Sequence, residues 1–519
     1  MKQKPSRRDF LKLLSAISLV PLANKVHFSP FDNRSISSKK KHPNIIIFLF
    51  DALSARNISL YGYSRKTTPN LEKFAKKATV FHRHYSSSNF TTPSTASFFT
   101  SVYPWTHRSI HLYSPITEKI RPNNLFSHLS NNENYYRIAL SNNLLADQIL
   151  HQFSKDIDNL FPVGTLTDIN HLYHDTLFKK DGTYSSKGLD VLSFRIRNSE
   201  DNLATSLVLS VLNEIIIAIR RELILKEIGG TYPLGIGHAH RMSYFTVDEI
   251  FNNLGTLLED IDEFPFVSYF HFMFPHFPYV PSEKFLDKFI NDGWKAIEKP
   301  LHILGSNESR EKMVEERNKY DAYIANIDDE FGKFVTSLES MGLLENSYII
   351  VTSDHGEMFE RGHIGHGSPL LYEPIIHIPL IIKAPEQSVQ EDIYSLTCTI
   401  DITPTLLHLT GNTIPDWCEG QILPSLGGKT DSNRAIYSMQ ARENSAFAPL
   451  EEASFAIYKN NYKLIEYIGY PTQRQPYEVY DILNDPEEMK DLSITNPSTV
   501  NELRTELYNK LNEVNKPFL

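Results

Sequence analysis

The chain has 519 residues, of which 41% are hydrophobic, 22% charged and 12% aromatic. This composition is typical of a globular protein and excludes a collagen-like or wholly disordered chain, while the length allows about two to four domains or one large α/β domain. The formal net charge is −10 and there is no block of basic residues. These features argue against a general nucleic-acid-binding protein, so we expect no nucleic-acid partner.

The N-terminal residues have the pattern of a targeting signal. Basic residues up to Arg8 precede an apolar run over residues 11–23, which is too short to span a bilayer comfortably. The string Ser-Arg-Arg-Asp-Phe-Leu-Lys at residues 6–12 resembles a twin-arginine signal, which implies export of the folded chain by the twin-arginine machinery to the periplasm or another extracytoplasmic space. The cleavage site near residues 21–23 is weak, so the segment could remain as an anchor. A chance basic helix is the alternative. We interpret residues 1–42 as a signal followed by a polar linker.

The first element after the linker is predicted to be a buried strand. Residues 44–50 form an unbroken β-branched and aromatic run, the pattern of a strand covered on both faces of a parallel sheet. Asp51 stands at its carboxyl end, where open α/β sheets bind ligands. Helical spacing then predicts helices over 69–77, with Pro69 near the first position, and over 93–102.

Residues 110–245 carry no motif, and we interpret them as a variable insert or lid. The apolar stretch 203–228 within them predicts a core or lid helix rather than a helix on a membrane surface.

The pattern becomes regular again after Tyr244. Strands are predicted over 266–274, 347–352 and 378–382, and helices over 246–261, 313–341 and 403–409, the last with Thr403 as N-cap, Pro404 at its first position and Gly411 near its end. Strands that alternate with helices predict an α/β fold with a large, mainly parallel sheet sandwiched by helices. We assign residues 43–412 to this domain.

Residues 413–519 are predicted to form a smaller α+β subdomain, which ends in a helix over 499–514. The chain has two cysteines, Cys398 and Cys418, too few for a disulfide framework or a four-cysteine zinc site. They form either one disulfide or, as we expect, two separate buried thiols.

Three distant segments place polar residues where a packed core would not take them. Asp51 follows the first strand, the Thr91-Thr92-Pro93-Ser94 string precedes an apolar helix, and Asp354-His355-Gly356-Glu357 follows the strand over 347–352. Carboxylates and an imidazole, with a threonine oxygen, would suit a four-coordinate Zn²⁺ or Mn²⁺ site. A hydroxyl on such a metal loses its proton more readily and becomes a nucleophile. Taken singly, each of these residues could equally be a cap or a turn residue.

The order of the motifs resembles that of the sulfatase family within the alkaline phosphatase superfamily. The resemblance is carried by residues 44–53 (Asn-Ile-Ile-Ile-Phe-Leu-Phe-Asp-Ala-Leu), 60–63, 67–71, 91–101 (Thr-Thr-Pro-Ser-Thr-Ala-Ser-Phe-Phe-Thr-Ser), 275–279 (Pro-His-Phe-Pro-Tyr), 352–357 (Thr-Ser-Asp-His-Gly-Glu), 365–367, 371–373, 378–382, 462–465 and 480–488. It covers about residues 43–108 and 246–490. It implies an alkaline phosphatase-like fold.

The resemblance also implies roles for individual residues. Asp51, Asp354 and His355 would bind the metal, and Thr91 would occupy the nucleophile position and also touch the metal. His276 and His366 would face the charged oxygens of the substrate or protonate the leaving group. His363 could assist, although for His363, and for His271 on the preceding strand, a purely structural role is the open alternative.

The departures from the family pattern concern the nucleophile. Most sulfatases have a cysteine or serine at the position of Thr91, which is converted to formylglycine, and an arginine where this chain has Thr95. Threonine cannot be converted in that way, so the resemblance implies no formylglycine and a Thr91 hydroxyl that itself attacks. A threonine ester has to be cleaved by water or another acceptor. This favours phosphodiester hydrolysis or phospho-group transfer over sulfate-ester cleavage.

A second departure concerns the metal. Calcium-type sulfatases have a second aspartate after the first one and an Asn or Gln after the later one, whereas here Ala52 follows Asp51 and His355 follows Asp354. Losing an oxygen ligand and gaining an imidazole favours Zn²⁺ or Mn²⁺ over Ca²⁺. No pair of residues suggests a second metal, so we expect one divalent ion.

The sequence thus predicts a metal-dependent hydrolase or transferase that acts on an anionic ester substrate, such as a phospho- or sulfo-glycan, a lipid or a small ester. Two alternatives remain open: a true sulfuric ester hydrolase without formylglycine, and a non-catalytic member that binds an anion or glycan.

Overall fold

The computed structural model of the protein describes residues 42–129, 135–167, 169–170, 218–219, 221–239, 243–261, 265–471 and 476–519. The predicted twin-arginine signal and nearly all of its linker lie outside these residues. Within them, no helix combines the length and the apolar character needed to cross a membrane.

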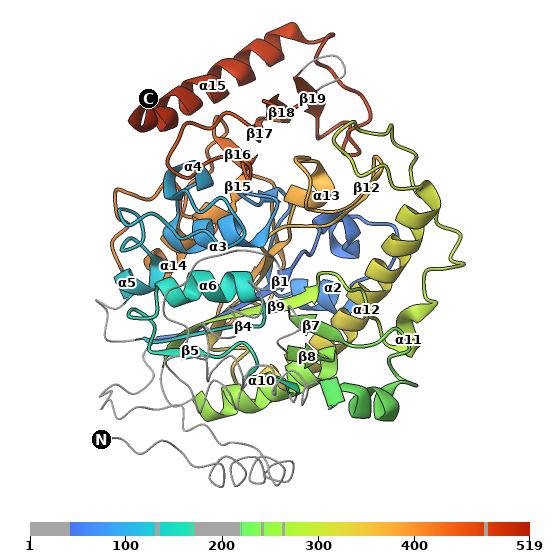
Figure 1. Ribbon diagram of the computed structural model, residues 1–519. Helices are drawn as coiled ribbons and strands as arrows, with labels where there is room; N and C mark the ends of the chain where they lie inside the picture. The colour runs from blue at the N-terminus through green and yellow to red at the C-terminus, as the bar shows by residue number, and fades with distance from the viewer. Residues whose placement is uncertain are drawn as a thin grey trace, which may run out of the picture. The chain divides into compact units, whose positions relative to one another are not determined.

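The central element is an eight-stranded sheet (Figure 1). Its order is β14 (Glu391–Ile393), β2 (Thr79–Phe81), β13 (Leu380–Lys383), β10 (Ser347–Ser353), β1 (Asn44–Asp51), β9 (Phe266–Pro275), β4 (Tyr136–Ser141) and β5 (Asn159–Phe161). The five strands from β10 to β5 are mutually parallel, and β13 is antiparallel to both of its neighbours. The expected large, mainly parallel sheet is therefore confirmed.

Helices cover both faces of this sheet, because the side chains of its central strands are apolar in both directions. Ile45, Ile47 and Leu49 of β1 pack in one buried cluster with Phe98 of α3. The alternate residue Phe48 points the other way, and its ring centroid lies 5.5 Å from that of Phe334 in α12. The first layer consists of α3 (Thr91–Thr100), α5 (Leu125–Leu129), α6 (Leu144–Gln152) and α14 (Ile402–Leu409), and the second of α2 (Pro69–Ala75), α10 (Val247–Ile261) and α12 (Arg310–Ser340) (Figure 1).

The C-terminal part forms an antiparallel sheet of its own. Its strands are β16 (Ala435–Gln440), β17 (Ala453–Lys459), β18 (Tyr462–Ile468) and β19 (Tyr477–Asp481), with α15 (Pro497–Asn515) packed against it (Figure 1). One buried cluster joins this sheet to the rest of the chain, since Tyr85, Trp105 and Tyr372 pack with Phe455 and Leu507. The C-terminal sheet is thereby fixed beside the edge of the main sheet. Its start at residue 413 as a separate subdomain stays a prediction.

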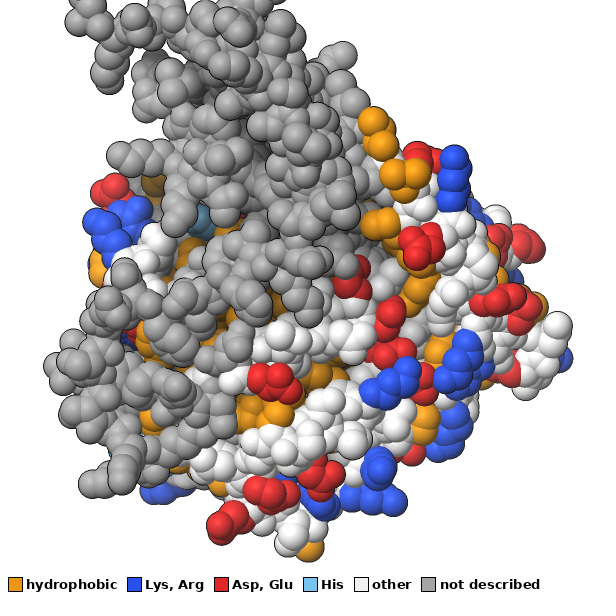
Figure 2. Space-filling model, turned by 90° about the horizontal axis from the view of Figure 1, so that it is seen from below, with side chains coloured by type: hydrophobic (Ala, Val, Ile, Leu, Met, Phe, Trp, Pro, Cys, Tyr) orange, Lys and Arg blue, Asp and Glu red, His pale blue; other side chains and the backbone are white. Residues whose placement is uncertain are grey.

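The remaining elements are short. They are the 3-10 helices η2 (Ala55–Asn57), η3 (Ser59–Tyr61), η4 (Thr399–Asp401) and η5 (Lys516–Phe518), the helices α4 (Pro104–His107), α11 (Glu283–Leu286) and α13 (Glu373–Ile376), and the strands β3 (His84–Tyr85), β6 (Ile169–Asn170), β7 (Gly237–Ala239), β8 (Ser243–Phe245), β11 (Met358–Glu360), β12 (His363–Gly365) and β15 (Thr397–Cys398). On the face shown in Figure 2, acidic and basic side chains are interspersed, and no basic block is visible among the coloured residues.

The structure corrects two predictions about local organisation. Within the segment 110–245, interpreted as an insert or lid, residues 136–161 supply β4 and β5 to the main sheet, because their apolar side chains are buried between the helical layers. Thr403 is not the N-cap of α14. The 3-10 turn η4 runs directly into the helix, Asp401 occupies the cap position, and the Thr403 hydroxyl donates to Phe98 O at 2.6 Å.

Two further predictions concern the 203–228 helix and the cysteines. Only residues 218–219 and 221–228 of the predicted helix belong to the described part, and they are helical. Cys398 and Cys418 are both free, as expected, although Cys418 is only half-buried.

Three buried histidines predict how the stability of the fold depends on pH. Burial is the main cause that lowers the pKa of His84 to about 3, of His107 to about 3 and of His377 to about 4. Each stays neutral in the folded chain but binds a proton near pH 6.5 when unfolded, so the unfolded state holds more protons below that pH. We expect the melting temperature to fall between pH 6.5 and pH 4, with each histidine removing about 1.4 kcal/mol of stability per pH unit.

A pH series of thermal unfolding curves measures this slope. His107→Gln keeps a hydrogen-bonding side chain next to Ser97, whose hydroxyl lies 3.1 Å from the imidazole Nε2, but cannot titrate. The variant should therefore show a shallower slope. An identical slope would show that this histidine does not contribute.

Candidate active site

Four neighbouring parallel strands bring polar side chains to one edge of the main sheet. Asp51 ends β1, Asp354 directly follows β10, and Asn143 lies two residues after β4. His271 lies within β9, in register with Leu49 of β1 and Ser141 of β4. Because the carboxyl ends of parallel strands meet at one edge, residues up to 303 positions apart converge there.

The centre of the site is a buried cluster of ligand atoms. One atom each from Asp51, His271 and Asp354 lies within 4.8 Å of the other two, and all three side chains are buried. Asp51 Oδ1, Asp354 Oδ2 and His271 Nε2 have no hydrogen-bond partner among the described residues. Two buried carboxylates with unpartnered oxygens are unfavourable without a cation. The cluster therefore fits a divalent metal ion.

His355 and Thr91 complete the ring of polar atoms. His355 Nε2 lies 3.5 Å from Asp51 Oδ1, 3.5 Å from Asp354 Oδ2 and 3.4 Å from Thr91 Oγ1. The other nitrogen, Nδ1, faces Gly356 O at 3.0 Å, which leaves Nε2 for the centre. Thr91 is the first residue of α3 and is 3% exposed. Its hydroxyl thus lies next to the cluster and at the positive end of a helix.

Asn143 links Thr91 to the cluster. Its Oδ1 accepts from Leu145 N at 2.7 Å and so caps α6. Its Nδ2 donates to Asp51 Oδ2 and lies 3.5 Å from Thr91 Oγ1. The amide is thereby held in one orientation, with its donor directed at the site.

Backbone geometry holds the two aspartates together. Ala52 has a positive φ of 61°, and its amide donates to Asp354 Oδ1 at 3.2 Å. Tyr320 of α12 stabilises the same turn, because its hydroxyl donates to Ala52 O at 2.6 Å. At Gly356 a Cβ would lie 2.1 Å from Pro374 O, so only glycine allows the loop after Asp354 to pack there.

A second group of ionisable residues surrounds the cluster. His366 Nδ1 lies 2.9 Å from Glu357 Oε1, and its ring centroid is 4.1 Å from that of His355 and 5.1 Å from that of His276. Burial lowers the pKa of His366 to about 3, and the charge of His276 adds to this. Burial raises the pKa of Glu357 to about 7 against the opposing effect of His276.

The charges of the aspartates act on the same residues. Burial lowers the pKa of His276, but Asp51 and Glu357 outweigh it and the net direction is upward. For Asp51, burial raises the pKa, and the positive charge of His276 together with the contacts to His271 and His355 brings it below its usual value. The site is thus a dense set of mutually dependent charges, the arrangement found at catalytic centres.

The structure brings together most of the residues selected from the sequence. Asp51, Thr91, Asp354 and His355 lie at the centre, and His276 and His366 lie beside them, both partly exposed. His363 of β12 is placed differently, because its Nδ1 lies 2.6 Å from the hydroxyl of Ser306.

Two residues of the centre were not assigned to it from the sequence. The sequence left the role of His271 open, although a histidine inside an apolar strand was itself a signal. Asn143 was missed. It directly precedes the helix at Leu144, the pattern of a cap.

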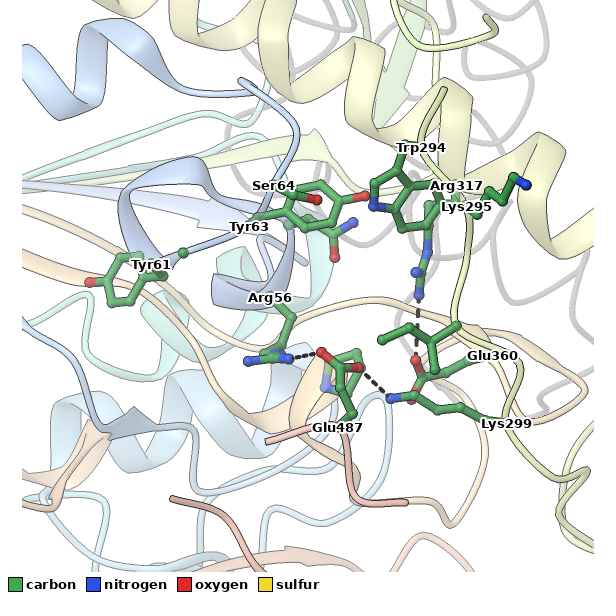
Figure 3. A pocket seen from close by; sticks show the side chains of 14 residues that line it. Arg56, Tyr61, Tyr63, Ser64, Trp294, Lys295, Lys299, Arg317, Glu360 and Glu487 are labelled. Carbon is green, nitrogen blue, oxygen red and sulfur yellow. Dashed lines mark hydrogen bonds and ion pairs between the residues drawn. The ribbon is translucent and has the colours of Figure 1, made fainter. Parts of the chain in front are cut away.

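A separate pocket of about 160 Å³ is lined by residues that include Arg56 of η2, Arg317 of α12 and Glu360 of β11 (Figure 3). Lys299 Nζ lies 2.9 Å from Glu487 and 3.0 Å from Glu360, and Arg56 also pairs with Glu487. The carboxylates neutralise these cations. We therefore interpret the wall of this pocket as a structural ion-pair network that holds β11 in place.

Comparison with known proteins identifies relatives of this architecture. The family model described as Sulfatase matches residues 43–161 and 163–412, and the model described as N-sulphoglucosamine sulphohydrolase, C-terminal, matches residues 363–517. Arylsulfatase K of Xenopus laevis is 26% identical over 196 residues, which cover 37% of this chain and 36% of that protein. The match thus spans little more than a third of that relative.

Two solved structures share the fold over nearly their whole length. The phosphonate monoester hydrolase of Agrobacterium radiobacter superposes with a TM-score of 0.63 at 18% identity, covering 92% of this chain and 96% of that one. A protein solved in complex with its substrate D-glucosamine-2-N,6-O-disulfate superposes with a TM-score of 0.60 at 17% identity, covering 92% and 99% of the two chains.

A mostly parallel sheet that gathers carboxylates and histidines at one edge defines an α/β protein with a candidate metal centre at its strand ends. Since the family match extends over most of the chain, the chain belongs to the sulfatase family. The resemblance carried by its motifs and the α/β fold expected from its sequence are both confirmed.

Proposed function

We propose that the protein cleaves anionic esters with the hydroxyl of Thr91 as nucleophile, and that it prefers phosphate diesters or phospho-group transfer to sulfate esters. The observation that carries the proposal is the position of Thr91 Oγ1, 3.4 Å from His355 Nε2 and next to the buried carboxylates. A divalent ion held by Asp51, His271, Asp354 and His355 would supply Lewis-acid polarisation of the substrate and a lower pKa for the threonine hydroxyl. Two imidazoles in this set support Zn²⁺ or Mn²⁺ over Ca²⁺.

Other residues of the site orient the reacting groups and bind the substrate. Asn143 Nδ2 donates toward the Asp51 and Thr91 side of the centre and orients both. His276 and His366 lie on the partly exposed side, where the substrate enters, so they bind its charged oxygens or protonate the departing alcohol. Water or an acceptor hydroxyl then cleaves the threonine ester, because threonine lacks the aldehyde route that releases sulfate from formylglycine.

The substrate class follows from the same chemistry. An anionic ester of a glycan, a lipid or a small alcohol suits a centre rich in histidines. A structural relative was solved with a disulfated glucosamine as its substrate, and another is a phosphonate monoester hydrolase. We also infer that the twin-arginine-like N-terminus directs the protein out of the cytoplasm.

A panel of chromogenic esters tests the proposal. The metal-loaded enzyme should turn over bis(4-nitrophenyl) phosphate with a kcat/KM at least about tenfold above that for 4-nitrophenyl sulfate, a difference of about 1.4 kcal/mol in transition-state stabilisation. The opposite order would favour a true sulfuric ester hydrolase. No turnover of either ester, despite bound metal, would favour a non-catalytic anion-binding protein.

A further inference from the structure

Arg442 reaches the neighbourhood of the active site from the C-terminal sheet. It lies two residues after Gln440, the last residue of β16, and its guanidinium carbon is 4.3 Å from the ring centroid of Phe90. Phe90 is buried and directly precedes Thr91. An arginine from a distant part of the chain is therefore placed beside the residue that precedes Thr91 at the start of α3.

The guanidinium lacks the partners that a partly buried arginine usually has. Arg442 Nε is buried without a hydrogen-bond partner among the described residues, and no ion pair within that part of the chain includes this side chain. Other half-buried arginines do have carboxylate partners, such as Arg504 with Glu466 at 2.9 Å and Arg434 with Asp401 at 2.5 Å. Burial lowers the pKa of Arg442. The negative charge of the neighbouring Glu443 opposes this shift but does not cancel it.

An unpaired guanidinium beside a reactive centre suits an anion supplied by a ligand. The fork of N–H donors binds carboxylate, sulfate or phosphate groups in bidentate fashion. In the proposed reaction, the ester group that is cleaved would lie over the cluster of Asp51, Asp354 and His355. Arg442 belongs to the rim, stacked on Phe90, rather than to that cluster.

We propose that Arg442 is a specificity residue that binds a second anionic group on the alcohol part of the substrate. The substrate class is then an ester that carries a further sulfate, phosphate or carboxylate near the scissile group. This inference rests on the proposed function, which it deepens by naming what the alcohol part contains. It predicts that ligands with two anionic groups bind more tightly than ligands with one.

Binding of two inert ligands tests the proposal without depending on turnover. The affinities of the full-length, metal-loaded protein for benzenesulfonate and benzene-1,3-disulfonate are compared by calorimetry. The wild type should bind the disulfonate at least about tenfold more tightly, the scale of one charge-assisted hydrogen-bonded contact. In Arg442→Gln the ratio should fall to about two or less, and Arg442→Lys should restore part of it.

Arg121→Gln is the matched control, because it removes the same charge from an exposed arginine and should leave the ratio unchanged. An Arg442→Gln protein that keeps the wild-type ratio would overturn the proposal, even if both affinities fall together, because that result describes a structural role. A wild type that binds both ligands equally, or neither, would also overturn it. A protein that hydrolyses no ester yet shows the Arg442-dependent ratio would instead contradict only the catalytic proposal.

Discussion

Replacing Thr91 by alanine should lower kcat/KM by on the order of 10³-fold or more, the scale observed when the nucleophile of an enzyme is removed. The substitution deletes the one hydroxyl that lies 3.4 Å from His355 Nε2 at the start of α3. It leaves Asp51, His271 and Asp354 in place, so metal content should stay close to that of the wild type. Steady-state kinetics on bis(4-nitrophenyl) phosphate, with metal analysis of the same preparation, measures both quantities.

Two companion variants separate the chemistry from the fold. Thr91→Ser keeps a hydroxyl and should retain much of the turnover, whereas Thr91→Val keeps the shape of threonine and should be as inactive as the alanine variant. The neighbouring Thr92, whose hydroxyl donates to Leu112 O, offers a control, and Thr92→Val should not reproduce the loss. A Thr91→Ala protein with full turnover would remove the nucleophile from the proposal.

The fold was predictable where burial dictates the sequence pattern. The run over 44–50 and the strand over 266–274 are apolar on both faces because helical layers cover both sides of the sheet, and they appear as β1 and β9. Prediction failed at β4 and β5. These strands are short, and the segment around them carries no motif, so pattern alone could not distinguish them from a lid.

The site was predictable where a residue follows a strand, and less so where it lies inside one. Asp51 and Asp354 stand at strand ends, which the sequence shows directly. His271 lies within β9, and only the register with β1 brings its Nε2 to 3.6 Å from Asp51 Oδ2. The contact of Arg442 with Phe90 depends on the packing of the C-terminal sheet beside the main one. These two residues are 352 positions apart in the sequence. Contacts of that kind arise from tertiary packing, not from local propensity.

Replacing Asp51 by asparagine should weaken metal binding by on the order of 100-fold or more, since loss of even an outer hydrogen-bond partner of a metal ligand costs about 10–100-fold. The isosteric amide keeps the size of the side chain but removes the negative charge. In the wild type, Mn²⁺ or Zn²⁺ at 100 times its dissociation constant should add about 2.7 kcal/mol of stability, and this gain should disappear in the variant. Thermal unfolding with metal and with chelator, together with metal analysis, measures the difference.

The chelated state separates metal binding from the stability of the fold itself. Even without a cation, and against the effect of burial, the positive charge of His276 and the contacts to His271 and His355 hold the pKa of Asp51 below its usual value. The charged carboxylate therefore contributes to stability, and the metal-free Asp51→Asn variant should unfold at a lower temperature than the metal-free wild type. Asp321→Asn is the control, because Asp321 is equally buried but already pairs with Arg65 at 2.8 Å. That change should lower the melting temperature in both states and leave the metal-dependent increase intact. If Asp51→Asn behaved like Asp321→Asn, the cluster at the strand ends would be a structural network and not a metal centre.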